Sequence, residues 1–305
     1  MNNKTIKIGK YTLSTMVMMT LMLEPKKKSC AYYSENEIRQ ADIVIRAGEW
    51  GNKETAKPGK RYNWGKDINI SKHGISIKEI PSDIPLRQEN GEWFISEFDI
   101  NLKLAKAIAK KLDTKYGVNT VLHYSTDKTT DLNSAGRRAL KCDPKIYLSV
   151  HHNYYSDDST GYFFMYNEGD TKSSEVANKL SNSISKNGKI PQRNNMVNNG
   201  YIGELNQFKG TGKISVLGEF GYFNKAEIVK ICSDEYVDYV SDKISEELYN
   251  QLQKINSKET MMIDNKNKEY IKITIKDEDA VVNNTRKTNV QEVIKLNFTC
   301  SFKLI

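Results

Sequence analysis

The chain has 305 residues and a formal net charge of +8, and 38% of its residues are hydrophobic. This length suits one large domain with an appendage, or two domains, with enough apolar material for a core. The four cysteines include no CxxC pair, which argues against a disulfide scaffold or a cysteine-rich zinc site. The basic charge favours a polyanionic partner, but no RNA-recognition, helix-turn-helix or zinc-finger pattern points to nucleic acid.

Residues 1–31 resemble a signal sequence for export. Lys4, Lys7 and Lys10 precede the apolar run YTLSTMVMMTLML, and SCA at residues 29–31 offers small residues for cleavage. The apolar run is too short to span a bilayer comfortably, so we expect no stable membrane span. The alternative is an uncleaved hydrophobic arm, which the charged EPKKK stretch that follows would favour. The leader therefore predicts a secreted protein.

Five short runs rich in Ile, Val, Tyr and Phe predict buried strands, at 42–47, 118–124, 145–151, 161–167 and 213–219. The clearest helix begins after Ser96, which can cap it, and ends at Gly117, with Leu104, Ile108 and Leu112 on one stripe. Further helices are expected at 131–142, 171–187 and 234–253. The alternation predicts an α/β fold with a largely parallel central sheet flanked by helices.

Two segments lie outside this alternation. Residues 50–95 are rich in Gly, Lys and Pro and hold all three tryptophans, which predicts a long insertion after the first strand and near the site. Residues 256–305 are rich in Lys and Asn and contain the alternating stretch YIKITIK. They predict a C-terminal appendage, either a small β-rich module or a disordered tail.

Polar side chains lie where three of the predicted strands end. Glu49 follows the first of these strands, His151 ends the second and Glu219 ends the third, while Glu97 lies in the first turn of the clear helix. The carboxyl ends of parallel strands meet at one edge of a sheet, where active sites collect. Two or three N and O ligands with a further carboxylate suit a catalytic zinc site, because the metal activates a water and the carboxylate takes its proton.

Each of these residues also has a purely structural interpretation. A lone histidine at a strand end usually packs or faces solvent, and the helix dipole favours a carboxylate such as Glu97 in a first turn. His152 points to the opposite face of the strand from His151, so both rings cannot bind one metal. Glu219 is harder to explain, because a carboxylate that ends a buried strand needs a partner or a purpose.

Four motifs in this order resemble the zinc-dependent N-acetylmuramoyl-L-alanine amidases, the catalytic domains that trim bacterial peptidoglycan. They are Gly48-Glu49 after the first strand, Glu97 opening a helix, SVHHN with His151 and Asn153, and EFGYFN with Glu219. NSAGRRAL, before the predicted strand at 145–151, is similar to an Arg-containing helix of that family. The resemblance covers residues 40–253 and implies hydrolysis of the amide bond between N-acetylmuramic acid and L-alanine.

The resemblance implies Zn²⁺ as the cofactor, with Glu97 and His151 as ligands, Glu219 as the catalytic base and His152 as an outward neighbour. The chain departs from the family at Glu49, where the family has its first zinc histidine. A second carboxylate would make the metal a weaker Lewis acid. Three outcomes stay open: Glu49 is the ligand, His73 of the insertion replaces it, or the protein is a catalytically impaired module that only binds cell wall.

The implied partner is peptidoglycan, with anionic cell-wall polymers as a further possibility and no nucleic acid, at a secreted or cell-wall-associated location. Asn153 is expected to contact the substrate. Trp64 and Trp93 are expected to stack on sugar rings, in an insertion whose basic residues suit anionic polymer. The alternative for the two tryptophans is a surface loop in which they only seal a small local core.

Overall fold

A computed structural model describes residues 32–33, 38–50, 67–125, 131–154, 156, 158–185 and 190–277. Residues Ser29–Ile255 form the first of two units of the chain. The first unit contains both β-sheets. The signal-like leader over 1–31 and Trp64 lie outside the described residues.

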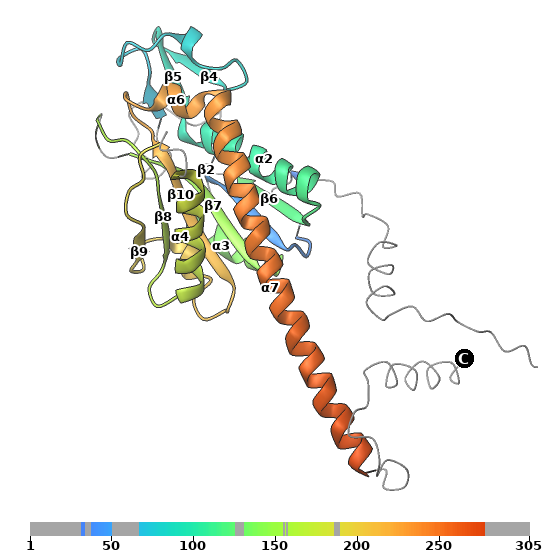
Figure 1. The fold of residues 1–305 in the computed structure, drawn as a ribbon. Coiled ribbons are helices and arrows are strands. Elements are labelled where there is room, and N and C mark those ends of the chain that lie inside the picture. The colour runs from blue at the N-terminus through green and yellow to red at the C-terminus, as the bar shows by residue number, and fades with distance from the viewer. Residues whose placement is uncertain are drawn as a thin grey trace, which may run out of the picture. The chain divides into compact units, whose positions relative to one another are not determined.

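A seven-stranded sheet forms the centre of the Ser29–Ile255 unit (Figure 1). The strand order is β1-β6-β2-β7-β10-β8-β9, and only the β10–β8 pair is antiparallel among these described strands. The five predicted strands and the largely parallel sheet are confirmed. The bounds are Tyr32–Tyr33 (β1), Ile43–Trp50 (β2), Thr120–Ser125 (β6), Ile146–Asn153 (β7), Phe163–Asn167 (β8), Met196–Asn198 (β9) and Ile214–Tyr222 (β10).

Helices cover both faces of this sheet (Figure 1). Helices α2, α4 and the first part of α7 pack on one face, whereas α3 and α5 pack on the other. The helix bounds are Glu97–Tyr116 (α2), Leu132–Leu140 (α3), Thr171–Ser185 (α4), Gly203–Asn206 (α5), Ile228–Cys232 (α6) and Asp234–Asp277 (α7). Since successive residues of a strand point to opposite faces, each central strand contributes to both layers.

Helix α2 carries the predicted apolar stripe, and Leu104, Ile108 and Leu112 are all buried. Gly117 ends the helix with φ of 65°, a left-handed conformation that glycine adopts without steric cost. The expected side-chain cap at Ser96 is wrong, because Ser96 occupies the N-cap position but its side chain makes no capping hydrogen bond. Its backbone instead belongs to a strand, where it pairs with Asp67.

The insertion contains a second sheet, of three antiparallel strands in the order β3-β5-β4. The strands are Asp67–Asn69 (β3), Leu86–Glu89 (β4) and Glu92–Ser96 (β5), with a 3-10 helix at Ile77–Glu79. Strand β5 leads directly into α2. The described part of the insertion is therefore a folded module that fixes where α2, and with it Glu97, begins.

Helix α7 continues over residues 256–277, where a β-rich module or a tail was expected. The β-rich alternative is wrong there, because YIKITIK is the end of this helix. Lys, Glu and Met between 258 and 269 are good helix formers, and extending a helix is easier than nucleating a new element. No helix in the described part of the chain combines the length and apolar character needed to cross a bilayer.

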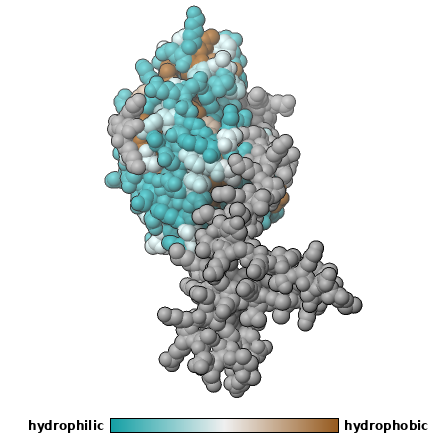
Figure 2. All heavy atoms as spheres, turned by 45° about the vertical axis from the view of Figure 1, so that its right-hand side comes forward, coloured by the Kyte–Doolittle hydropathy of each residue, from teal (hydrophilic) through white to brown (hydrophobic). Residues whose placement is uncertain are grey.

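The described surface is mainly hydrophilic on the face that Figure 2 shows. Large hydrophobic side chains that remain exposed are Ile38, Ile77, Tyr154 and Tyr201, together with the neighbours Met196 and Val197 of β9. Single exposed apolar residues are normal on globular proteins. The polar surface agrees with the charged composition of the chain.

Candidate active site

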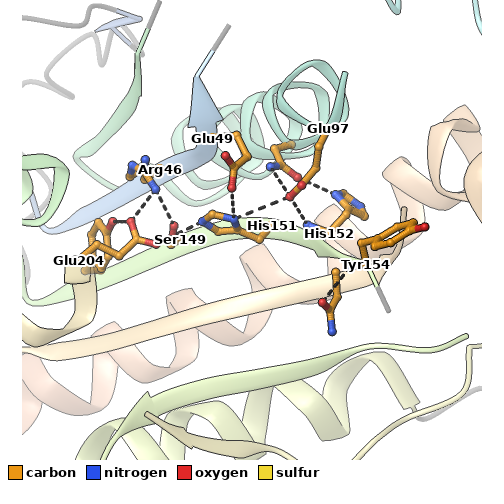
Figure 3. A network of polar contacts seen from close by, with 11 residues as sticks. Arg46, Glu49, Glu97, Ser149, His151, His152, Tyr154 and Glu204 are labelled. Carbon is orange, nitrogen blue, oxygen red and sulfur yellow. Dashed lines mark hydrogen bonds and ion pairs between the residues drawn. The ribbon is translucent and has the colours of Figure 1, made fainter. Parts of the chain in front are cut away.

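The ends of β2 and β7 and the start of α2 bring three buried side chains together (Figure 3). Glu49, Glu97 and His151 each offer one ligand atom, and these atoms lie within 4.8 Å of one another. Nδ1 of His151 lies 3.8 Å from Oε1 of Glu49 and 3.8 Å from Oε1 of Glu97. The described residues contain no second cluster of this kind. The three residues expected at the metal therefore do meet at the carboxyl edge of the sheet.

The backbone around Glu49 allows the His151 ring to come close to β2. A Cβ atom at Gly48 would overlap the imidazole ring of His151, so the ring occupies space that only glycine leaves open. Glu49 itself has φ of 59°, a left-handed conformation that costs a non-glycine residue about 1–3 kcal/mol. The pairing of β2 with β6 shifts between Arg46 and Trp50, so the strand's regular alternation is broken here. The Glu49 carboxylate consequently points toward His151 (Figure 3).

Glu97 is held over the end of β7 by two hydrogen bonds. Its Oε1 accepts from the backbone N–H of His152 at 3.2 Å and from Nδ2 of Asn101 at 3.3 Å. Glu97 is the first residue of α2, where the helix dipole also favours a negative charge. These contacts give the carboxylate a fixed position beside His151.

Glu49 and Glu97 place two negative groups in a buried site. Burial and the Glu97 carboxylate raise the pKa of Glu49 to about 8, although His151 and Arg46 act in the opposite direction. Oε2 of Glu49 is buried and has no hydrogen-bond partner among the described residues. A cation would satisfy this oxygen and relieve the repulsion between the carboxylates. One imidazole and two carboxylates are donors that zinc accepts, so these residues fit a divalent metal ion.

A fourth carboxylate, Glu204 of α5, lies on the other side of the His151 ring. Oε2 of Glu204 accepts from Nη1 of Arg46 at 2.5 Å and from the hydroxyl of Tyr147 at 2.7 Å. Its Oε1 lies 3.2 Å from Nε2 of His151. Burial opposes the charged form, yet Arg46 and His151 lower the pKa of Glu204 to about 2. Glu204 is therefore an ionised, fully buried carboxylate.

The sequence did not single out Glu204, which lies 53 residues from His151 in a helix of only 4 residues. One signal was available, because Arg46 interrupts the apolar run of β2 and a buried cation needs an anionic partner. That signal predicts a partner but does not identify it.

The carboxylates on both sides of the ring control the charge of His151. Burial alone would lower the pKa of His151, but hydrogen bonding to Glu204 and Glu97 raises it well above the usual value. The imidazole is thus the positive centre of an acidic cluster when no metal is bound.

His152 does point to the opposite face from His151, but its expected outward position is wrong. Helix α2 covers that face, so His152 is only 2% exposed and its Nδ1 lies 2.7 Å from Oδ1 of Asn101. Burial, together with the charge of His151, lowers the pKa of His152 to about 3. His152 is therefore a neutral packing residue that helps to orient Asn101.

Glu219 lies on β10, directly opposite His151 in the parallel ladder with β7. Paired residues of adjacent strands project from the same face, so the carboxylate and the imidazole share one side of the sheet. Glu219 is partly buried and is one of the charges that raise the pKa of His151. It does not belong to the three-residue cluster. Glu219 is therefore a further carboxylate on the His151 face of the sheet, outside the cluster.

The remaining predicted site residues have less central positions. Asn153 ends β7, and its Oδ1 accepts from the backbone N–H of Tyr154 at 2.8 Å. Trp93 of β5 is partly buried against the main hydrophobic core rather than in a small local one. His73 follows β3 and is not a member of the Glu49–Glu97–His151 cluster. Trp64 lies outside the described residues.

Comparisons with known proteins agree with this architecture. The family model described as N-acetylmuramoyl-L-alanine amidase matches residues 87–254, more than half of the chain. This match begins after β2 and so does not include Glu49. No curated protein matches the chain.

Solved structures of similar fold come from several bacteria. N-acetylmuramoyl-L-alanine amidase from Clostridium difficile 630 is 19% identical with a TM-score of 0.51, and the match covers 71% of this chain and 98% of that one. Ami1 from Mycobacterium smegmatis is 15% identical with a TM-score of 0.51, and the match covers 72% of this chain and 100% of that one. The catalytic domain of CwlV from Bacillus (Paenibacillus) polymyxa var. colistinus is 20% identical with a TM-score of 0.50, and the match covers 69% of this chain and 97% of that one. At such identities the likeness shows the fold alone.

Proposed function

We propose a function for this chain, which belongs to the N-acetylmuramoyl-L-alanine amidase family. It hydrolyses the bond between N-acetylmuramic acid and L-alanine in peptidoglycan with the help of Zn²⁺. The observation that carries the proposal is the meeting of Glu49, Glu97 and His151 at one edge of the sheet. The orphaned Oε2 of Glu49 supports a cation there. These three residues would hold the ion.

When bound, Zn²⁺ supplies a Lewis acid that polarises the amide carbonyl and makes water more acidic. Glu219 takes a proton from the attacking water, since it lies on the same face as His151 and outside the proposed ligand set. It then returns the proton to the amide nitrogen as the C–N bond breaks. The products are a free carboxylate on the muramic acid side and a free amino group on L-alanine.

Glu49 supports a second candidate, a wall-binding protein of the same fold with impaired catalysis. A carboxylate in place of an imidazole adds negative charge, which weakens the metal as a Lewis acid. Arg46 offsets part of this charge, because it is one of the groups that stabilise ionised Glu49. We favour the enzyme because the carboxylate still points into the cluster.

The deciding experiment measures metal content and peptide release on the same purified protein. Zinc at one equivalent, with new muramoyl carboxylates and L-alanine amino ends released from purified peptidoglycan, supports the amidase. Glu219→Gln is the matched control, since it leaves all three proposed ligands intact. Absence of metal with retained binding to wall fragments would support the impaired module instead.

The substrate implies where the protein works. Peptidoglycan lies outside the cytoplasmic membrane, so we infer a secreted or cell-wall-associated protein. The net charge of +8 supports additional contact with anionic wall polymers. Binding to wall sacculi should weaken with added salt and should fall when the anionic polymers are stripped from them.

A further inference from the structure

The two ring nitrogens of His151 face different carboxylates. Nδ1 lies 3.8 Å from both Glu49 and Glu97, whereas Nε2 lies 3.2 Å from Oε1 of Glu204 (Figure 3). The imidazole thus lies between the other two members of the cluster, Glu49 and Glu97, and Glu204, which takes no part in that cluster. The identity of the nitrogen that binds a metal depends on which one carries the hydrogen.

Glu204 already accepts hydrogen bonds on its other oxygen, from Arg46 at 2.5 Å and from Tyr147 at 2.7 Å. An ionised carboxylate only accepts, so the contact between Oε1 and Nε2 requires the hydrogen to be on Nε2. A neutral ring with hydrogen on Nε2 has its lone pair on Nδ1. That lone pair faces Glu49 and Glu97.

The surroundings of Glu204 fix its carboxylate firmly enough to keep the hydrogen of His151 on Nε2. Helix α3 packs so closely on α5 that a Cβ atom at Gly136 would lie 2.5 Å from the backbone oxygen of Glu204. The next residue, Leu205, is buried, and its carbonyl accepts from Nδ2 of Asn167 at 2.6 Å. The carboxylate therefore reaches His151 from a short helix that is fixed on two sides.

Arg46 balances the buried charge of Glu204, and it lies on β2 only three residues before Glu49. The same strand thus provides a proposed metal ligand and the cation that stabilises the carboxylate behind His151. Arg46 also donates to Oγ of Ser149 at 3.4 Å, which ties β2 to β7 at this level.

We propose that Glu204 is a positioning residue that holds hydrogen on Nε2 of His151 and so presents Nδ1 to the metal ion. This inference rests on the proposed function, because the ion is the Zn²⁺ proposed there. Metal-binding histidines generally donate their second N–H to such a partner, and loss of the partner costs about 10–100-fold in metal affinity or activity.

The first test titrates the metal-free full-length chain with Zn²⁺ and uses Glu204→Gln with Tyr147→Phe as its control. Tyr147→Phe removes a hydrogen bond to Glu204 but leaves the contact with His151 in place. We expect Glu204→Gln to bind Zn²⁺ at least about tenfold more weakly, and Tyr147→Phe to change affinity less than about threefold. Equal affinities for wild type and Glu204→Gln would overturn the positioning role.

The second test needs no variant and therefore does not depend on the folding of one. With ¹⁵N-labelled histidine and ¹¹³Cd²⁺ as the probe, metal–nitrogen coupling should appear at Nδ1 of His151 and a proton at Nε2. Coupling at Nε2 would refute the inference while leaving the proposed function intact. A wild-type protein that binds neither ion would instead overturn the proposed function, and the role of Glu204 with it.

Discussion

Glu49→Gln is expected to stabilise the metal-free protein while weakening its metal site. Glu49 has a pKa of about 8 in the folded protein, against 4.5 as its ordinary value. Between these values the folded protein binds a proton that the unfolded chain has already released, so stability falls as pH rises through this window. The shift corresponds to a cost of about 3 kcal/mol at pH 7 and about 1 kcal/mol at pH 5.

Glutamine has nearly the same shape and cannot ionise, so the variant escapes this cost. We expect metal-free Glu49→Gln to gain up to about 3 kcal/mol at pH 7, or roughly 6–12 °C in Tm, but only about 1 kcal/mol at pH 5. The control is Glu168→Gln, an exposed carboxylate in the turn after β8, which should stay within about 0.5 kcal/mol at both pH values.

Thermal unfolding in a chelator, at pH 5 and pH 7, measures these gains. Saturating Zn²⁺ should reverse the order of the two proteins, because wild type keeps the stronger site and a bound ion stabilises only the folded state. An equal gain at both pH values, or a loss at pH 7, would refute the view that Glu49 is held beside Glu97 at an energetic cost.

Five further variants test the rest of the site. Glu49→His should bind Zn²⁺ more tightly and hydrolyse peptidoglycan faster near neutral pH, since it restores the family's first ligand; no change in either would contradict Glu49 as a ligand. His151→Ala should lose both metal and activity, whereas Glu219→Gln should keep its zinc and lose hydrolysis, and an active Glu219→Gln would disprove the base assignment. Gly48→Ala should destabilise the protein by about 1–3 kcal/mol and lower metal affinity, because the added methyl overlaps the His151 ring; an unchanged Tm would mean that the ring can move aside. Trp93→Ala should lower Tm because Trp93 packs on the core, and wall binding measured on the same variant shows whether it also contacts sugar.

Local patterns in the sequence were sufficient for the strands, for helix α2 and for the convergence of Glu49, Glu97 and His151. Strands and helices have different hydrophobic periods, and the rule that parallel strands end at one edge needs no knowledge of side-chain contacts. The same rule placed Glu219 near His151, because it depends only on where each strand ends.

The contacts between distant segments were decided by the tertiary structure. His152 was expected to face outward because a strand pattern gives the direction of a side chain but not what covers that face, and α2 covers it. YIKITIK alternates like a strand, yet it continues a helix that was already formed. Glu204 reaches His151 only because α3 and β8 fix a helix of 4 residues against the sheet, 53 residues along the chain. No periodic pattern encodes such a contact, since it depends on how separate layers pack rather than on the order of neighbouring residues.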